Sequence, residues 1–78
     1  MPVKPRGTAT RAFLIPARLV QYRGAERMSR RELAGTIGLS ERTVEAWETG
    51  TRRPRPDSIE ALATALGCTV DDLTGGTE

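Results

Sequence analysis

The segment Ser29–Thr49 constrains the fold more than any other part of this chain of 78 residues. It begins with Ser-Arg-Arg-Glu, the pattern of a capping box. In this box the hydroxyl of Ser29 accepts a free backbone N–H and the carboxylate of Glu32 reaches back to the cap. Gly38 follows one and a half turns later, and glycine readily takes the left-handed conformation that closes a helix. The pattern therefore predicts a short helix followed by a sharp turn.

A second short helix is predicted directly after this turn. Ser40 is a favourable N-cap, and the helix that it begins should run to about Trp47 or Glu48. Val44 and Trp47 are three residues apart and form its inner face. Two short helices joined by a tight, glycine-containing turn constitute a helix-turn-helix unit.

The inner face of this unit carries residue types that its packing requires. Ala34 supplies the small side chain where the two helices cross, Gly38 permits the turn, and Leu39 is expected to plug the corner. The complete predicted inner face consists of Leu33, Ala34, Ile37, Gly38, Leu39, Val44 and Trp47. This set of residues predicts the fold but does not indicate what the protein binds.

Three further helices are predicted around the unit. Pro16 is favourable at the first position of a helix over roughly 16–26, and Pro56 is favourable at the start of another that Gly67 closes. Thr69 begins a short fifth helix. The chain is thus expected to be all-α, with a flexible basic tail over residues 1–12, one domain over residues 13–74 and a frayed end over residues 75–78.

The composition excludes several kinds of site. The chain has no histidine and a single cysteine, Cys68, so an intrachain disulfide, the common zinc-ligand sets and His-based catalytic triads are not expected. Cys68 is interpreted as a small packing residue. No apolar run approaches the roughly 20 residues of a membrane span, and the charged N-terminus lacks the apolar part of a signal peptide. We therefore expect a cytoplasmic protein that is not an enzyme, with no metal, cofactor, membrane or small-molecule ligand.

The net charge of +2 conceals an uneven distribution along the chain. Residues 1–31 hold eight basic side chains against one acid, whereas residues 56–78 hold five acids and no base. Between them, residues 52–55 contribute three arginines. Blocks of one sign suggest one face for a polyanion and one turned away from it. The alternative is an ordinary solvated surface whose charges cluster only in the sequence.

Several segments resemble the Cro and phage-repressor family of helix-turn-helix proteins, also called the xenobiotic-response-element family. The resemblance runs from Ser29 to Leu73 and reaches back through Leu19, Tyr22 and Arg23. Its matching segments are Met28–Ala34, Gly38–Ser40, Val44–Gly50, Ala63–Gly67 and Val70–Leu73. The resemblance implies a five-helix, lambda-repressor-like domain whose third helix enters the major groove of DNA.

In this motif the first residues of the second helix face base edges. The residues expected to contact bases are Ser40, Glu41, Arg42 and Ala46. Arg42 can donate two hydrogen bonds to guanine O6 and N7, Glu41 can accept from cytosine N4, and Ala46 can pack on a thymine methyl group. The alternative for Glu41 and Arg42 is that they are solvated charges on an exposed turn. The role of Glu45 stays open.

Contacts with the DNA backbone are expected from other residues. Arg30 stands where the family commonly has a glutamine that contacts the backbone, and arginine should make this contact more sensitive to salt. The other residues expected to contact backbone are Thr43, Gly50 through its amide, Arg52, Arg53 and Arg55. Arg23 and Glu48 match family positions that pair across the back of the motif, so they are expected to form a structural ion pair.

The sequence therefore predicts a regulator of transcription that binds specific sequences of double-stranded DNA. A repressor is favoured over an activator, because repression requires only occupancy of the site. The operator is expected to be pseudo-palindromic and bound by a homodimer, with the fifth helix and the Phe13–Ile15 cluster as candidate contact surfaces. The alternatives are an antitoxin or immunity regulator of its own operon, and a protein-interaction module without DNA binding. Such a module would not need the arginines at positions 30, 42 and 52–55.

Overall fold

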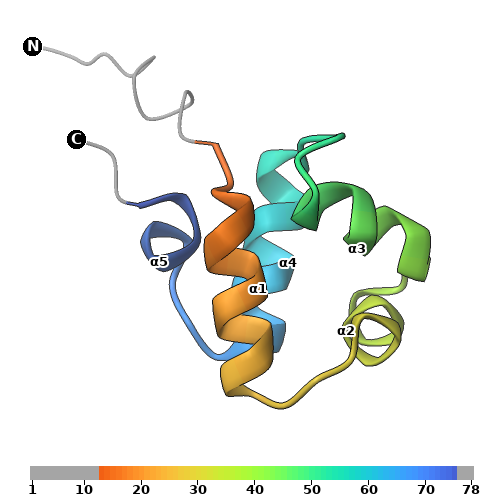
Figure 1. Cartoon of the computed structure of the whole chain (residues 1–78). Coiled ribbons are helices and arrows are strands. Elements are labelled where there is room, and N and C mark those ends of the chain that lie inside the picture. The colour runs from red at the N-terminus through yellow and green to blue at the C-terminus, as the bar shows by residue number, and fades with distance from the viewer. Residues whose placement is uncertain (1–12, 76–78) are drawn as a thin grey trace, which may run out of the picture.

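The computed structural model describes residues 13–75, which form five α-helices and no strand (Figure 1). The helices are α1 (Pro16–Ala25), α2 (Arg30–Ile37), α3 (Glu41–Glu48), α4 (Pro56–Leu66) and α5 (Val70–Thr74). The predicted all-α fold with five helices is therefore confirmed. The predicted tail over residues 1–12 lies outside the described residues, as do residues 76–78 of the predicted frayed end.

The ends of the helices follow from local side-chain chemistry. At α2 the amide of Glu32 donates to Ser29 Oγ at 2.9 Å and the amide of Ser29 donates to Glu32 Oε1 at 2.8 Å, which completes the capping box. Gly38 ends this helix with φ = 77°, a conformation that costs a side-chain-bearing residue free energy. The reciprocal bonds between Thr69 and Asp72 form a second capping box at α5.

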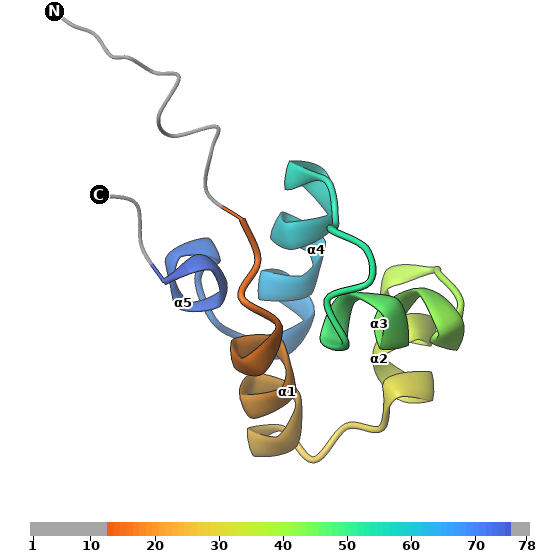
Figure 2. The same cartoon turned by 45° about the horizontal axis from the view of Figure 1, so that its top comes forward.

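The core lies between the five helices. In Figures 1 and 2, α2 and α3 lie on one side of α1 and α4, and α5 lies on the other. Helix α4 packs against α2 and α5, and α3 packs against α1 and α2. The buried apolar side chains are Leu14, Leu19, Leu33, Ala34, Val44, Trp47, Ile59, Leu62, Ala63, Leu66 and Leu73. This single core fixes the orientation of α3 and leaves its outer face free.

Two apolar predictions are wrong. Leu39 does not plug the corner between α2 and α3, because its side chain is 44% exposed. The turn is closed instead by the backbone, in which the amide of Leu39 donates to Ala34 O at 2.9 Å beyond the left-handed Gly38. The Phe13–Ile15 cluster is not a uniformly exposed surface either, since Leu14 belongs to the core and is only 7% exposed.

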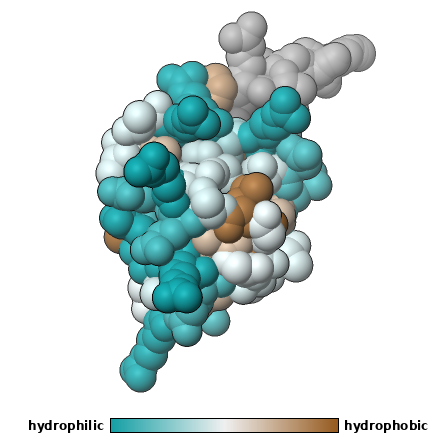
Figure 3. Space-filling view, turned by 90° about the vertical axis from the view of Figure 1, so that its right-hand side faces the viewer, coloured by the Kyte–Doolittle hydropathy of each residue, from teal (hydrophilic) through white to brown (hydrophobic). Residues whose placement is uncertain are grey.

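The apolar surface on the α2 and α3 side is small. Figure 3 shows this side of the molecule, where one apolar patch stands out near the middle and hydrophilic side chains cover much of the rest. A monomer surface of this kind is normal and does not by itself indicate a protein interface. The features that distinguish this side are therefore its charges and its shape.

Candidate nucleic-acid interface

Helix α3 has a buried face and an exposed polar face. Val44, Trp47 and Glu48 point into the protein, whereas Glu41, Arg42 and Glu45 are exposed. The two sets alternate with the period of a helix, because residues three and four apart lie on the same side. The helix is thus fixed by one face and presents charged groups on the other.

Five of the residues expected to contact DNA line one hollow of about 290 Å³. Its lining is formed by Ser40, Arg42, Thr43, Ala46, Thr51 and Arg52. It therefore brings together three of the expected base contacts and two of the expected backbone contacts. The fourth expected base contact, Glu41, is exposed at the start of α3 and does not line this hollow.

Thr51 is the lining residue that sequence reasoning missed. After α3 the chain turns back, and the amides of Thr51 and Arg52 both donate to the carbonyl oxygen of Ala46, at 2.9 and 3.2 Å. Gly50 makes this reversal possible with φ = 79°. Glycine just beyond a helix is a known signal for such a turn, and this signal could have placed Thr51 beside α3.

Gly50 serves this turn, and its predicted contact with the DNA backbone stays a prediction. Its amide, which the sequence assigned to phosphate, donates within the protein to Trp47 O at 3.3 Å. A backbone N–H that already has an acceptor has less to offer a ligand. The structure thus shows the left-handed conformation of Gly50 and one acceptor for its amide.

The hydroxyl groups of Ser40 and Thr43 form a pair at the start of α3. Ser40 Oγ accepts the amide of Thr43 at 3.2 Å and lies 2.8 Å from Thr43 Oγ1. One hydroxyl donates within this pair, so the hydrogen of the other stays available to an outside acceptor. Ser40 thus caps the helix, and the pair can still donate one hydrogen bond at the edge of the hollow.

The carboxylate of Glu48 binds two arginines behind this surface. Its side chain is 1% exposed, and its Oε1 accepts from Arg23 Nη2 at 3.1 Å and from Arg30 Nε at 2.8 Å. Arg23 Nε donates to the other oxygen, and Arg23 Nη1 donates to the carbonyl oxygen of Met28 at 2.8 Å. The structure thus places Arg23 and Glu48 in the two-pronged contact that the family resemblance implied. Arg30 is the third member of this network, which the sequence did not reveal.

The charge state of Glu48 follows from these contacts. Burial alone would raise the pKa of the Glu48 carboxyl, but the hydrogen bonds from Arg23 and Arg30 outweigh it and hold this pKa below its ordinary value. The hydrogen bond to Glu48 also raises the pKa of Arg30. Glu48 is therefore an anion that fixes two cations at the junction of α1, α2 and α3.

Arg30 keeps part of its guanidinium outside this network. Its side chain is 38% exposed, and its Nη1 lies 4.0 Å from Glu45 Oε2. An arginine has five N–H donors, so the bond from Nε to Glu48 leaves others for an external phosphate. The same guanidinium partly neutralises Glu45 on the exposed face of α3, which reduces the repulsion between that carboxylate and a polyanion.

The arginines of the loop between α3 and α4 are exposed. Arg52, Arg53 and Arg55 make no ion pair with any acid in residues 13–75. The guanidinium of Arg53 lies over the ring of Phe13, with Cζ 4.4 Å from the ring centroid. The loop therefore presents positive charge directly beside the hollow at α3.

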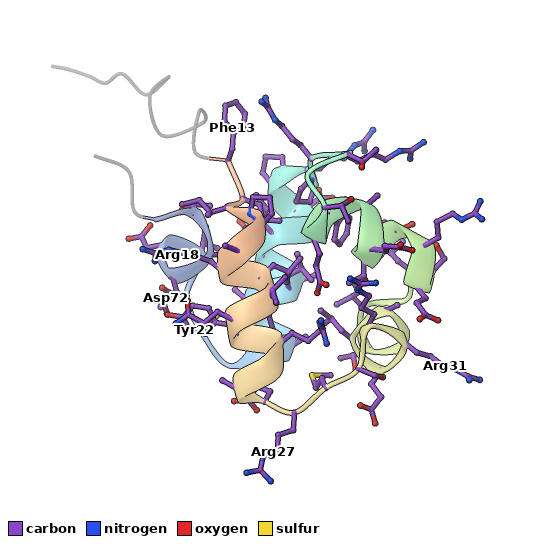
Figure 4. All side chains as sticks on the ribbon, viewed as in Figure 1. Phe13, Arg18, Tyr22, Arg27, Arg31 and Asp72 are labelled. Carbon is purple, nitrogen blue, oxygen red and sulfur yellow. The ribbon has the colours of Figure 1, made fainter. Side chains whose placement is uncertain are left out.

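Arg18 of α1, Arg27 of the connection that follows it and Arg31 of α2 do not lie on one face. Arg18 donates from Nη1 to the carbonyl oxygen of Asp72 at 3.0 Å, on the α5 side. Arg27 and Arg31 point in two other directions (Figure 4). Arg18, Arg27 and Arg31 thus cluster along the chain and not on the surface. The positive charge near α3 comes from Arg30 and from the loop.

Other kinds of site find no support in residues 13–75. They contain no group of three or more His, Cys, Asp or Glu that could hold a metal ion. None of their helices has the length and apolar character needed to cross a membrane. Cys68 packs half-buried against the core, and this burial raises the pKa of its thiol, which disfavours the reactive thiolate.

A family model and several solved structures match this chain. A family model described as helix-turn-helix matches residues 19–73. No sequence among the curated proteins matches the chain significantly. The matched residues include all of α2, α3 and α4, and thus the hollow and the loop arginines.

Solved structures of DNA regulators are similar to the chain. The restriction-modification controller protein C.AhdI from Aeromonas hydrophila is 33% identical, with a TM-score of 0.70 over 73% of this chain and 86% of that one. The P22 c2 repressor, solved with a synthetic operator, is 27% identical, with a TM-score of 0.73 over 80% of this chain and 96% of that one. SinR, a master regulator for biofilm formation solved with DNA, is 25% identical, with a TM-score of 0.70 over 74% and 97%.

Proposed function

The chain belongs to the helix-turn-helix family of the Cro and phage-repressor type, and from this premise we propose that it regulates transcription by binding specific sequences of double-stranded DNA. Helix α3 enters the major groove, as the second helix of this motif does. The observation that carries the proposal is the hollow at which α3 and the following loop meet. There, groups suited to base edges lie next to groups suited to phosphates.

Base recognition is assigned to the exposed start of α3. Arg42 donates to O6 and N7 of a guanine, which is the commonest specific contact of arginine with DNA. Glu41 accepts from the amino group of a cytosine, and Ala46 packs on a thymine methyl group. Ser40 lies at the same edge and contributes through its hydroxyl pair with Thr43.

Backbone contacts are assigned to groups on both sides of α3. Arg30 lies at the start of α2, and Thr43 lies at the edge of the hollow. The loop supplies the positive charge of Arg52, Arg53 and Arg55. Such contacts set the register of a protein on the duplex without reading its sequence. The P22 c2 repressor and SinR, both solved with DNA, support this arrangement.

The regulator acts as a repressor and binds as a homodimer. Repression follows from occupancy of an operator alone, and the P22 c2 protein to which the chain is similar is a repressor. Two copies on a pseudo-palindromic operator place their recognition helices in half-sites about 34 Å apart, or a multiple of this spacing. A dimer therefore reads two half-sites with one α3 each.

Titration of random duplex DNA at two salt concentrations tests whether this surface binds DNA. A basic surface that neutralises several phosphates loses affinity steeply between about 50 and 200 mM salt. Arg52→Ala should reduce the slope of log affinity against log salt by about 1. Arg27→Ala is the matched control, because Arg27 has the same charge and lies on the α1–α2 connection. Absence of binding at either salt concentration would exclude the proposal and favour a protein-interaction module.

A further inference from the structure

Phe13 holds an unusual position for a large apolar residue. Its side chain is 51% exposed, so its ring contributes little to the core. One face of the ring is nevertheless occupied, because the guanidinium of Arg53 lies over it at 4.4 Å from the centroid. Figure 4 shows Phe13 at the same end of the molecule as the start of α1. The ring thus meets a loop that lies 40 residues further along the chain.

The backbone next to Phe13 is firmly attached. The neighbouring Leu14 is buried in the core at 7% exposure. The amide of Ile15 donates to the carbonyl oxygen of Leu73 in α5 at 2.9 Å. These two attachments fix the point from which the ring of Phe13 extends. The ring therefore extends from a backbone that the core and α5 hold in place.

The loop that carries Arg53 is held by hydrogen bonds at its start and spans a hollow further along. Its start is held by the amides of Thr51 and Arg52, but beneath it lies a hollow of about 240 Å³ whose lining includes Phe13, Trp47 and Arg53. Within residues 13–75, Arg53 has no acid at ion-pair distance. The ring of Phe13 is thus the group that the structure places against this guanidinium.

Stacking leaves a guanidinium able to bind phosphate. A cation over an aromatic ring uses the face of the guanidinium, whereas its N–H donors point outward in the plane of the group. The ring therefore restricts the rotamers of Arg53 without consuming its hydrogen bonds. A side chain that is ordered before binding loses less conformational entropy when the ligand arrives.

We propose that Phe13 is a positioning residue for DNA binding, because its ring holds the guanidinium of Arg53 in place to contact a backbone phosphate. The inference rests on the proposed function, in which the loop between α3 and α4 lies along the DNA backbone. Phe13 itself does not contact the DNA in this arrangement. Phe13 affects the affinity for DNA only by positioning the guanidinium of Arg53.

A double-mutant cycle tests this dependence. Phe13→Leu keeps an apolar side chain without a π face and should weaken duplex binding about two- to fivefold, the range that an exposed cation–π contact provides. Phe13→Tyr keeps an aromatic π face and should bind the duplex with the affinity of the wild type. In an Arg53→Ala background Phe13→Leu should have no effect. Equal affinity of wild type and Phe13→Leu, or an undiminished effect without Arg53, would overturn the proposal.

Two further measurements separate this proposal from a loss of folding and from failure of the proposed function. The thermal midpoint of Phe13→Leu without DNA should fall by no more than about 8 °C, the loss that an exposed cation–π contact accounts for in a domain of this size, so the variant stays folded in the binding assay. In the free protein, NMR should show a ring-current shift of the Arg53 side-chain protons that Phe13→Leu abolishes, and absence of this shift would overturn the proposal. Failure of the proposed function is distinct, because then the wild type itself would not bind duplex DNA.

Discussion

Arg30 donates a hydrogen bond from Nε to the buried carboxylate of Glu48 at 2.8 Å, which ties the start of α2 to the end of α3. Arg23 of α1 binds the same carboxylate. A single anion thus joins three helices, and one of its cations also reaches the surface proposed to face DNA. This network joins α3 to α1 and α2 in addition to the contacts of the apolar core.

Glu48→Gln should destabilise the fold by about 2 kcal/mol. The substitution keeps the shape of the side chain but removes the charge that two guanidinium groups share. Breaking a fully buried ion pair costs about 3–5 kcal/mol, and the partial exposure of Arg23 and Arg30 reduces this value because water can solvate them. The free energy of unfolding by urea measures the loss.

The matched control for this change is Glu45→Gln. Glu45 is 56% exposed and lies 4.0 Å from Arg30, so its neutralisation should change the unfolding free energy by less than about 0.5 kcal/mol. Equal effects of the two substitutions would mean that burial of Glu48 does not matter.

The same carboxylate should make stability depend on pH. The folded protein holds the pKa of Glu48 below its ordinary value of 4.5, so its contribution is present above that pH and is lost as pH falls through the lower folded pKa. Asp72, whose pKa is lowered by hydrogen bonds from Thr69, acts in the same direction. Unfolding curves between pH 7 and 3 should show a smaller loss of stability for Glu48→Gln than for the wild type. Parallel curves would contradict the assignment, because Asp72 is common to both proteins.

Arg27→Gly should stabilise the protein by roughly 0.5–1 kcal/mol. Arg27 has φ = 58°, a left-handed conformation that costs an L-residue about 1–2 kcal/mol and glycine almost nothing, whereas the added flexibility of unfolded glycine offsets part of the gain. Arg27→Ala removes the same charge but keeps the β-carbon, so it should not stabilise. A thermal midpoint that rises equally for both variants would attribute the gain to charge and not to the backbone.

The boundaries of the helices could be predicted from the sequence because their causes are local. Ser29, Ser40 and Thr69 cap helices through bonds to residues three positions away. Pro16 and Pro56 begin helices as predicted, since proline fits the first position without losing a hydrogen bond. The apolar spacing within each helix then selects the buried face.

Contacts between residues far apart in the sequence could not be predicted from such local patterns. The contact between Arg30 and Glu48 joins residues 18 positions apart, and no local pattern signals it. Thr51 reaches the hollow only because the chain turns back at Gly50. Leu39 was expected inside because it is apolar, but backbone bonds alone close its turn and leave it at the surface.

Arg30→Ala should weaken binding to all duplex sequences alike. A phosphate contact carries no base information, so its loss should lower the slope of log affinity against log salt by about 1 and leave the preferred site unchanged. Arg31→Ala is the matched control, because the neighbouring Arg31 is exposed and points away from this network (Figure 4). Equal slopes for the two variants would show that only net charge matters and that Arg30 makes no specific contact.

Selection of bound sequences from a random duplex library, carried out with the wild type and with Arg42→Ala, tests whether α3 reads DNA. The wild type should recover a pseudo-palindrome with a guanine in each half-site. Arg42→Ala should lose the preference at that guanine alone, with a decrease in affinity of about 1–3 kcal/mol. Recovery of the same site with the same preference by both proteins would contradict the assignment of α3 as the helix that reads DNA through Arg42.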